Sequence, residues 1–467
     1  MPRPKGKGRH GKSVFLRASV AIISYRIKIE ILILTLPPPC HAVFWRDREG
    51  RGGSQIYHIM QPFELHIPTR IFFGKEKTSS FFEHLPEYGK KCLLVIGGGS
   101  VKRLGFLDEV QNHLKKNGVE LVLFEGIEPN PHSKTINKAA GIGKSENVKF
   151  VLALGGGSVM DASKAIAGMI HDNLDDIWPY TVGGPKYRQI TGALPVACIP
   201  TTAATASEVT AHAVISNPEV KGKSPISYPF MKPLASWLNP AYHTSLPLTT
   251  TRDGASDILS HVFENYLLGG SDSDLADRYS EGVMETVIDT LPKIELDPEN
   301  EHLRGQMLWA STMALNNMQI AGRQPAPFTL HNLEHALSGQ NPDLAHGRGL
   351  AILYPAYFRW LLKNDRVTDR LALLGKRLFG ISKQDQKENA LAFIEAFEGW
   401  LKDNGLYERL SDQGIPKEAF GDVADYAIKT YGGGKDELSA AGPLTRENII
   451  EIFEMTEEQA AVAAIEK

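Results

Sequence analysis

The pentapeptide GGGSV occurs twice, at residues 97–101 and 155–159. Each copy follows a short apolar run, KCLLVI in the first case and KFVLAL in the second, and each precedes a segment with helical periodicity. A short apolar run that ends in glycines predicts a buried strand followed by a tight turn. Two such strand–turn–helix units restrict the fold strongly, because strands separated by helices are expected to pair in parallel.

Further strands and helices surround the two units. VELVLFEGIEPNP and LPVACIPTTAATASEV each contain a predicted strand, and FLDEVQNHLKKNG is a predicted helix with a glycine stop. Strand and helix alternate from about residue 90 to 200, which predicts a mostly parallel sheet with helices on both faces. After about residue 240 the patterns are mostly helical. We therefore expect an α/β domain over residues 60–240 and an all-helical domain over 241–467.

Residues 1–59 differ from the rest of the chain, with eleven lysines and arginines against three acidic residues. Their apolar stretch, SVFLRASVAIISYRIKIEILILTL, is interrupted by charges, whereas a membrane span needs about 20 mostly uncharged residues. A transit peptide is conceivable, but an upstream start codon is favoured, because MQPFELHIPTRIFFGK from Met60 resembles a natural N-terminus that leads into a strand. We expect this basic extension to be poorly ordered.

Charge and cysteine content exclude several classes of function. The net charge of −3 gives no general attraction to nucleic acid. The three cysteines, Cys40, Cys92 and Cys198, are far apart and form no CxxC pair, which argues against a disulfide framework or a thiolate zinc site. A reducing cytoplasmic location fits this cysteine usage.

The glycine turns favour a bound nucleotide. Glycine lets the backbone approach a ligand closely, and the carboxyl edge of a parallel sheet is where a pyrophosphate binds. A single glycine turn would be explained by local geometry alone, but two in one sheet favour a nucleotide site. Neither has the G-x-G-x-x-G pattern or the GK[ST] of a P-loop. The hydroxyl-rich stretch PTTAATASEV is either a plain loop or a polar cradle beside a cofactor.

A second set of residues suggests a metal site. Asp257 and His261 are four residues apart on a predicted helix, His331 and His335 repeat this spacing, and His346 follows. Residues at i and i+4 lie on one helix face. One carboxylate and several imidazoles suit iron, zinc, nickel or copper, with a coordination position left for substrate. Each histidine taken alone would be an ordinary core or surface residue, so spacing alone leaves the metal site an open alternative.

Taken together, the motifs resemble the iron-containing (group III) alcohol dehydrogenase family. The segments that carry the resemblance are GGGSVMDASKAIA, PTTAATASEVT, DGASDILSHVFENYL and HNLEHALSGQNPDLAHGRGLAIL. The resemblance implies a dinucleotide-binding α/β domain, an all-helical metal-binding domain and an active-site cleft between them. The segments LHIPTRIFFG and IGGGSVKRLGFLDEV are most similar to the branch of NADPH-dependent aldehyde reductases and butanol dehydrogenases.

The resemblance also assigns site residues by position. The metal ligands it implies are Asp257, His261, His331 and His346. His335 and Lys223 would be catalytic, with His335 beside the ligands or facing the substrate. The cofactor-binding residues it implies are Gly97, Gly98, Ser100, Gly156, Gly157, Ser158, Asp161, Thr201, Thr202 and Ser207.

The sequence departs from the family pattern at three places. One extra residue separates His331 from His346, so the loop between them must bulge. Ala204 and Ala206 replace two glycines, and Asn239-Pro240 replaces an Asp-Pro.

The reaction implied is hydride transfer between a nicotinamide cofactor and a small primary alcohol or aldehyde, assisted by Fe²⁺ or Zn²⁺. The turn GGGSVKR carries Lys102 and Arg103 and no acid, which favours NADP(H) over NAD(H). A homodimer is expected from the family. The alternatives are a polyol dehydrogenase, a lyase similar to dehydroquinate synthase, and a non-catalytic metal-binding helical protein. The neutral segment before His331, in which Arg323 is the one base, favours a small uncharged substrate.

Overall fold

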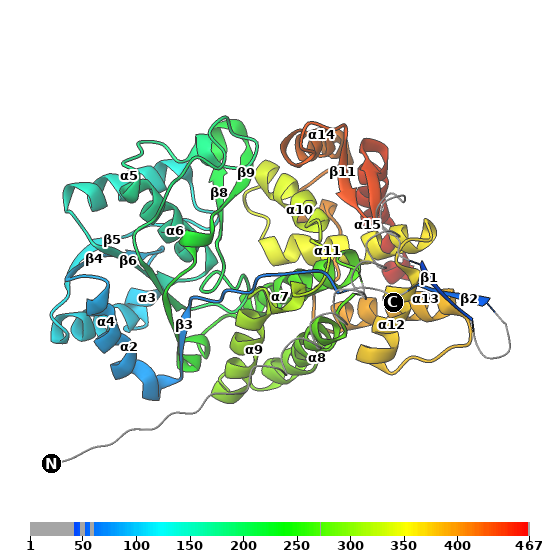
Figure 1. Ribbon diagram of the computed structural model, residues 1–467, viewed down its shortest axis with the longest axis horizontal. Helices are drawn as coiled ribbons and strands as arrows, with labels where there is room; N and C mark the ends of the chain where they lie inside the picture. The colour runs from blue at the N-terminus through cyan, green and yellow to red at the C-terminus, as the bar shows by residue number, and fades with distance from the viewer. Residues whose placement is uncertain (1–41, 47–51, 57–59, 271, 466–467) are drawn as a thin grey trace, which may run out of the picture. The chain divides into compact units, whose positions relative to one another are not determined.

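The computed structural model describes residues 42–46, 52–56, 60–270 and 272–465 (Figure 1). The chain divides into two units, 1–59 and 60–467. In the first unit, β1 (Ala42–Arg46) and β2 (Gly52–Ile56) form an antiparallel hairpin. The sequence did not predict this hairpin. The rest of the basic extension lies outside the described residues, so its expected poor order stays a prediction.

A six-stranded sheet forms the first part of the second unit. Its strands lie in the order β3 (Arg70–Phe73), β10 (Ala235–Leu238), β7 (Val196–Pro200), β6 (Phe150–Gly155), β4 (Lys91–Ile96) and β5 (Glu120–Phe124). Every neighbouring pair is parallel. The predicted parallel sheet is therefore confirmed.

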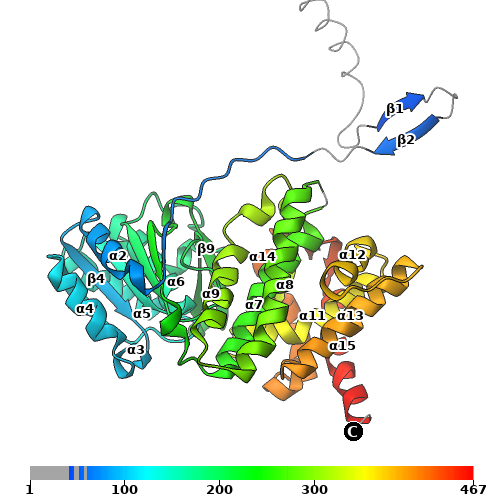
Figure 2. The ribbon, with the colours of Figure 1, turned by 90° about the horizontal axis from the view of Figure 1, so that it is seen from below.

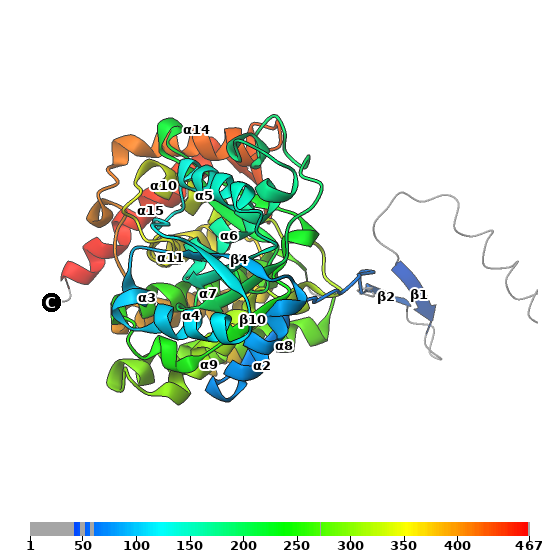
Figure 3. The same cartoon turned by 90° about the vertical axis from the view of Figure 1, so that its left-hand side faces the viewer.

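Helices cover both faces of this sheet, as Figure 3 shows. They are α2 (Thr78–His84), α3 (Ser100–Arg103), α4 (Phe106–Lys116), α5 (Ser133–Ser145) and α6 (Gly157–His171). The alternation along β4 explains the two layers: Leu93 and Val95 join a core that includes residues of α5 and α6, whereas Leu94 and Ile96 join a core that includes residues of α2 and α4. Successive side chains of a strand point to opposite faces, so an apolar run buries both.

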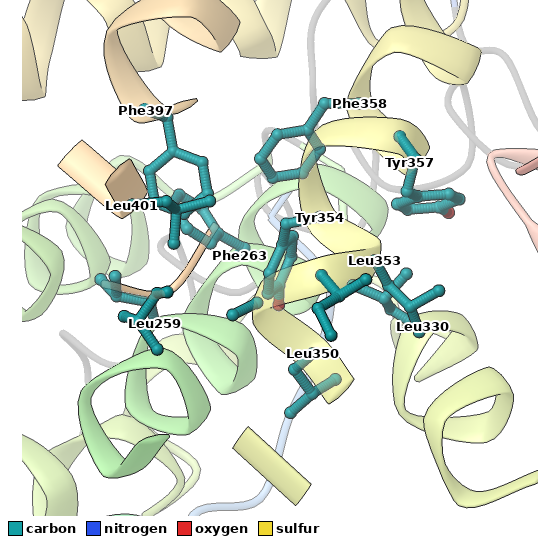
Figure 4. Close-up of a cluster of buried hydrophobic side chains, with 14 of the residues drawn as sticks. Leu259, Phe263, Leu330, Leu350, Leu353, Tyr354, Tyr357, Phe358, Phe397 and Leu401 are labelled. Atoms are coloured by element: carbon teal, nitrogen blue, oxygen red, sulfur yellow. The ribbon is translucent and has the colours of Figure 1, made fainter. Parts of the chain in front are cut away.

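The second part of this unit is built mainly from helices (Figure 2). They are α7 (Leu248–Leu268), α8 (Asp274–Leu296), α9 (Glu301–Ala314), α10 (Thr329–Gln340), α11 (His346–Lys363), α12 (Thr368–Phe379), α13 (Gln386–Asp403), α14 (Phe420–Tyr431) and α15 (Arg446–Ile465). Aromatic residues join α7, α11 and α13: the ring of Phe263 lies 5.4 Å from that of Tyr354 and 5.3 Å from that of Phe397 (Figure 4). This packing fixes α7 against α11.

Two short hairpins were not anticipated. In the helical part, β11 (Glu437–Ala440) pairs with β12 (Gly442–Thr445). In the α/β part, β8 (His212–Asn217) pairs with β9 (Gly222–Ser227), a segment for which the sequence analysis made no prediction of secondary structure. Because β8 packs against α6 and β9 packs against α10, this hairpin connects the sheet to the helical part. The predicted domain boundary at residue 240 stays a prediction. In the structure, β10 ends at Leu238 and the long helices begin at Leu248.

No helix in the described part of the chain is long and apolar enough to cross a membrane.

Candidate functional site

Three helices bring the predicted metal ligands together. Asp257 and His261 lie one turn apart on α7, His331 lies on α10, and His346 is the first residue of α11. His346 directly follows the loop of residues 341–345, as the sequence led us to expect. The Nε2 atoms of His261 and His346 each lie 3.6 Å from Asp257 Oδ1, and that of His331 lies 3.8 Å from it.

These atoms fit a divalent cation. Donor atoms held tetrahedrally at bond lengths of about 2.1 Å are separated by about 3.4 Å, close to the three distances from Asp257 Oδ1. The donor atoms of Asp257, His331 and His346 all lie within 4.8 Å of one another, a group that does not include His261. Asp257 Oδ1 is buried and has no hydrogen-bond partner among the described residues, an arrangement that is costly unless a ligand satisfies the oxygen. One carboxylate oxygen and three imidazole nitrogens are a suitable donor set for iron or zinc.

The protonation states of Asp257 and His261 agree with this fit, whereas His331 would have to lose a proton to a metal: burial alone would lower its pKa, but the carboxylates of Asp257 and Glu264 raise it to about 9. Burial alone would raise the pKa of Asp257, but His261, His346 and His331 hold it well below its usual range. Burial lowers the pKa of His261 to about 3, although Asp257 partly opposes this shift. The carboxylate is therefore ionised and His261 is neutral at pH 7, which are the forms that bind a metal.

Two buried glutamates, which the sequence analysis missed, orient the histidines. Glu264 on α7 lies with Oε2 2.5 Å from His331 Nδ1, and its Oε1 accepts a hydrogen bond of 2.6 Å from the backbone N–H of Leu330. Glu334 on α10 forms a short hydrogen bond with His346 Nδ1. An Nδ1–H that donates to a carboxylate fixes the tautomer and leaves Nε2 free to bind a metal. The signal available in the sequence was the spacing of Glu264, three residues after His261 on the same helix.

The Glu264→Gln variant tests this orientation. The two carboxylate oxygens accept hydrogen bonds from the backbone of Leu330 and His331 and from the His331 ring, whereas an amide has one acceptor oxygen. We expect the affinity for Fe²⁺ or Zn²⁺ to fall by about 10- to 100-fold, measured by titration of metal-free protein. Glu285→Gln, an exposed change on α8, is the matched control. Equal affinities in the two variants would contradict this role.

The predicted catalytic residues lie beside the same cluster. His335 is buried, its ring stacks on that of His346 with centroids 5.2 Å apart, and its Nδ1 has no partner among the described residues. Burial, and secondarily the charge of Lys223, lowers the pKa of His335 well below its usual value. Lys223 Nζ donates to Ser338 Oγ at 2.9 Å and lies 3.6 Å from Glu334 Oε2. Both residues are thus held in place beside the proposed ligands.

A cavity of about 370 Å³ joins these residues to the second glycine turn. Its lining includes all four predicted metal ligands, both predicted catalytic residues, and Gly157, Ser158 and Asp161 at the start of α6. Leu315, Phe328 and Val182 add apolar surface. The cavity therefore brings part of the predicted cofactor site and the metal cluster into one space.

The other predicted cofactor residues lie along the carboxyl edge of the sheet. Gly97, Gly98 and Ser100 follow β4, Gly156 follows β6, and Thr201 and Thr202 follow β7, and these three strands are neighbours. A Cβ at Gly156 would lie 2.9 Å from Thr202 Oγ1, and one at Gly157 would lie 2.6 Å from Thr205 Cγ2. The second turn therefore needs glycine to pack against the hydroxyl-rich segment.

Asp161 and Ser207 hold that segment in place. Asp161 accepts hydrogen bonds from Ser207 Oγ at 2.5 Å and from the backbone N–H of Val214 at 2.8 Å. Lys164 forms an ion pair with Asp161 that is not on the surface, because Lys164 is fully buried: its Nζ lies 3.2 Å from Asp161 Oδ1 and donates to the backbone oxygen of Ser207. These contacts fix residues 207–214 over the start of α6.

The departures from the family pattern leave the cluster intact. The extra residue before His346 is taken up by a loop at residues 341–345, in which the Leu344 N–H donates to the Asn341 oxygen at 3.1 Å. Ala206 adopts a left-handed conformation, with φ of 51°, at a position where the pattern has glycine. Asn239 accepts a hydrogen bond from the Ala241 N–H and caps the short helix that follows.

Comparisons with known proteins agree with this geometry. The iron-containing alcohol dehydrogenase family matches residues 68–240, and its C-terminal counterpart matches residues 251–456. The NADH-dependent butanol dehydrogenase A of Clostridium acetobutylicum is 35% identical over 397 residues, which cover 84% of this chain and 99% of the relative. The NADPH-dependent aldehyde reductase of Escherichia coli is 36% identical over 358 residues, covering 76% and 90% of the two chains.

A solved structure shows the same fold. The crystal structure of an NADH-dependent butanol dehydrogenase A from Thermotoga maritima superposes with a TM-score of 0.80 and 34% identity, covering 86% of this chain and all of the other. The resemblance inferred from the sequence is thereby confirmed. The chain belongs to the iron-containing alcohol dehydrogenase family, and as a member it is an oxidoreductase, an alcohol dehydrogenase or aldehyde reductase that uses a nicotinamide cofactor and an iron-type metal.

Proposed function

We propose that this protein transfers hydride between NADP(H) and a small primary alcohol or aldehyde at the cavity beside Asp257. The observation that carries the proposal is the unpartnered Asp257 Oδ1, which faces three imidazole Nε2 atoms within 3.8 Å at the wall of that cavity. The resident groups would be one Fe²⁺ or Zn²⁺ ion and the nicotinamide cofactor.

Each residue has a distinct proposed role. Asp257, His261, His331 and His346 would hold the ion. When bound, the ion polarises the substrate oxygen, and the nicotinamide exchanges hydride with the carbon that bears it. The glycine turns at the ends of β4 and β6 would let the backbone approach the cofactor.

We assign to His335 the transfer of the proton that the substrate oxygen gains or loses. Its depressed pKa keeps the ring neutral at pH 7, and its unpartnered Nδ1 lies in a ring that lines the cavity. A neutral imidazole can pass a proton to or from the substrate oxygen, directly or through water. Lys223, tied to Ser338 and close to Glu334, would position this part of the cavity wall.

The segment before His331 favours a small uncharged substrate. Arg323, which the sequence analysis singled out as the one base in this segment, is buried and lies 2.5 Å from Asp277 Oδ1. It is therefore not available to bind a carboxylate or phosphate on a substrate. This supports an aldehyde or alcohol over the charged substrate that a lyase of the dehydroquinate synthase kind would need.

The finer choice of cofactor rests on the residues of the first turn. Lys102 and Arg103 favour the 2′-phosphate of NADP(H), as the sequence analysis proposed. The similar proteins do not decide the matter, because an NADH-dependent and an NADPH-dependent enzyme are related to this chain at nearly equal identity. We also propose that the protein is a homodimer, on the basis of its family.

Reduction of butanal and methylglyoxal by the purified protein tests the proposal. We expect NADPH or NADH to be oxidised, chelation to stop the reaction, and Fe²⁺ or Zn²⁺ to restore it. The His331→Ala variant should be inactive, and His302→Ala, an exposed histidine on α9, should be as active as the wild type. If neither cofactor is oxidised with any restored metal, the proposed reaction is wrong.

A further inference from the structure

An acidic residue lies next to the first glycine turn, on a strand that the sequence analysis did not connect with it. Glu125 directly follows β5, the parallel neighbour of β4, and the turn of Gly97 directly follows β4. Glu125 Oε2 lies 2.5 Å from Lys102 Nζ, and both side chains are nearly half exposed. The ion pair therefore lies at the solvent-facing carboxyl edge of the sheet.

Backbone contacts fix this arrangement. The N–H of Gly126 donates to the Gly97 oxygen at 3.4 Å, and the N–H of Ile127 donates to the Ile96 oxygen at 3.2 Å. Gly126 has φ of 96°, which is favourable only for glycine and turns the chain after Glu125. A Cβ placed on Gly98 would meet nothing within 4 Å. The turn beside the Glu125–Lys102 pair thus has open space above it.

Glu125 occupies a position like that of the acidic residue that binds the adenosine ribose in other dinucleotide-binding sheets. In dinucleotide-binding α/β sheets, a carboxylate further along the chain from the glycine turn accepts a hydrogen bond from the adenosine 2′-hydroxyl. The same carboxylate repels the 2′-phosphate of NADP(H) by like charge. Here it also neutralises Lys102, the base that would otherwise bind this phosphate.

We infer that Glu125 is a specificity-determining residue that limits the preference for NADP(H) over NAD(H). It does so by holding Lys102 and by offering its own carboxylate to the ribose hydroxyl of NAD(H). This inference rests on the proposed function, because it assumes that the adenosine ribose lies beside the first glycine turn. The nearby Glu128 has a different role, since its Oε1 accepts a hydrogen bond of 2.6 Å from Thr135 on α5.

The kinetic test compares kcat/KM for NADPH and NADH with butanal at fixed ionic strength. The Glu125→Gln variant keeps the size of the side chain and removes its charge. We expect the ratio of NADPH to NADH efficiency to rise on the order of tenfold, because a negative charge near the phosphate is removed and Lys102 is released. Adding Lys102→Met to this variant should cancel most of the rise.

Glu120→Gln is the matched control. Glu120 begins β5 and pairs with Lys91 at the start of β4 at 3.0 Å, so it forms an ion pair between the same two strands at the opposite edge of the sheet. Removing the charge of Glu120 should leave the ratio of NADPH to NADH efficiency within twofold of the wild-type value. An unchanged ratio in Glu125→Gln, or an equal rise in Glu120→Gln, would overturn the inference.

A binding measurement separates this inference from the proposed function. Calorimetric titration with 2′,5′-ADP and with 5′-ADP needs neither metal nor turnover. In Glu125→Gln the affinity for 2′,5′-ADP should rise severalfold, while that for 5′-ADP should not. If both fragments bind the wild type and the variant shows no selective gain, only the specificity role fails. If neither fragment binds the wild type, the nucleotide site itself is misplaced and the inference falls with it.

Discussion

The Asp257→Ala variant is expected to purify without bound metal and to reduce aldehydes on the order of a thousandfold more slowly than the wild type. Asp257 Oδ1 lies 3.6 to 3.8 Å from each of the three imidazole Nε2 atoms, and it is the anionic member of the set. Without it, three neutral imidazoles would have to hold a dication in a buried site with no compensating charge from a ligand.

The measurement is metal content per chain, followed by aldehyde reduction with added Fe²⁺ or Zn²⁺. Asp289→Ala, an exposed change on α8, controls for the loss of a carboxylate from a neighbouring helix and should keep both properties. Circular dichroism of both variants establishes that the fold is kept. An Asp257→Ala protein that retains stoichiometric metal would show that the ion binds elsewhere.

The Gly347→Ala variant is expected to lose stability by about 3 kcal/mol and to bind metal poorly. A Cβ at Gly347 would lie 1.8 Å from the backbone oxygen of Asp253, so α11 cannot keep its contact with α7. The two neighbours of Gly347 matter as well: His346 is a proposed ligand, and Arg348 Nε donates to Asp253 Oδ1 at 2.9 Å. The added methyl group would therefore displace a ligand together with the start of its helix.

Chemical unfolding of the metal-free protein measures the stability change apart from metal loss. Gly399→Ala within α13 is the control, because a Cβ there would meet nothing within 4 Å. Replacing a mid-helix glycine by alanine without strain should raise stability by about 0.5 to 1 kcal/mol. We expect the free energy of unfolding to fall in Gly347→Ala and to rise in Gly399→Ala. Two similar small changes would contradict the close approach of α7 and α11.

Local patterns predicted much of this molecule because they depend on neighbours in the chain. The apolar runs before the glycine turns became β4 and β6, and the spacing of Asp257 and His261 placed both on one face of α7. Helix geometry fixes an i, i+4 pair without any knowledge of tertiary structure. That pair is the part of the proposed metal site that the sequence places by itself.

Contacts between distant segments could not be predicted in this way. Glu264 meets His331, and Glu125 meets Lys102, because helix packing and strand pairing bring them together. The residues of the first turn do not reveal Glu125, because it follows the neighbouring strand and only the pairing of β4 with β5 brings it beside the turn. The burial of Lys164 was also missed, because its position three residues after Asp161 predicts an ion pair on one helix face but does not reveal that residues 207–214 cover both side chains.

The proposed ligands come from three helices, α7, α10 and α11, so a bound ion would act as a crosslink among them. A ligand that binds the folded chain and not the unfolded one stabilises it by mass action, by about 2.7 kcal/mol when the free ion is at a hundredfold excess over its dissociation constant. The melting temperature of this protein would then report the concentration of free metal. Under metal starvation the same arrangement would leave the apoprotein less stable and more readily degraded, so that the amount of enzyme would follow the supply of its ion.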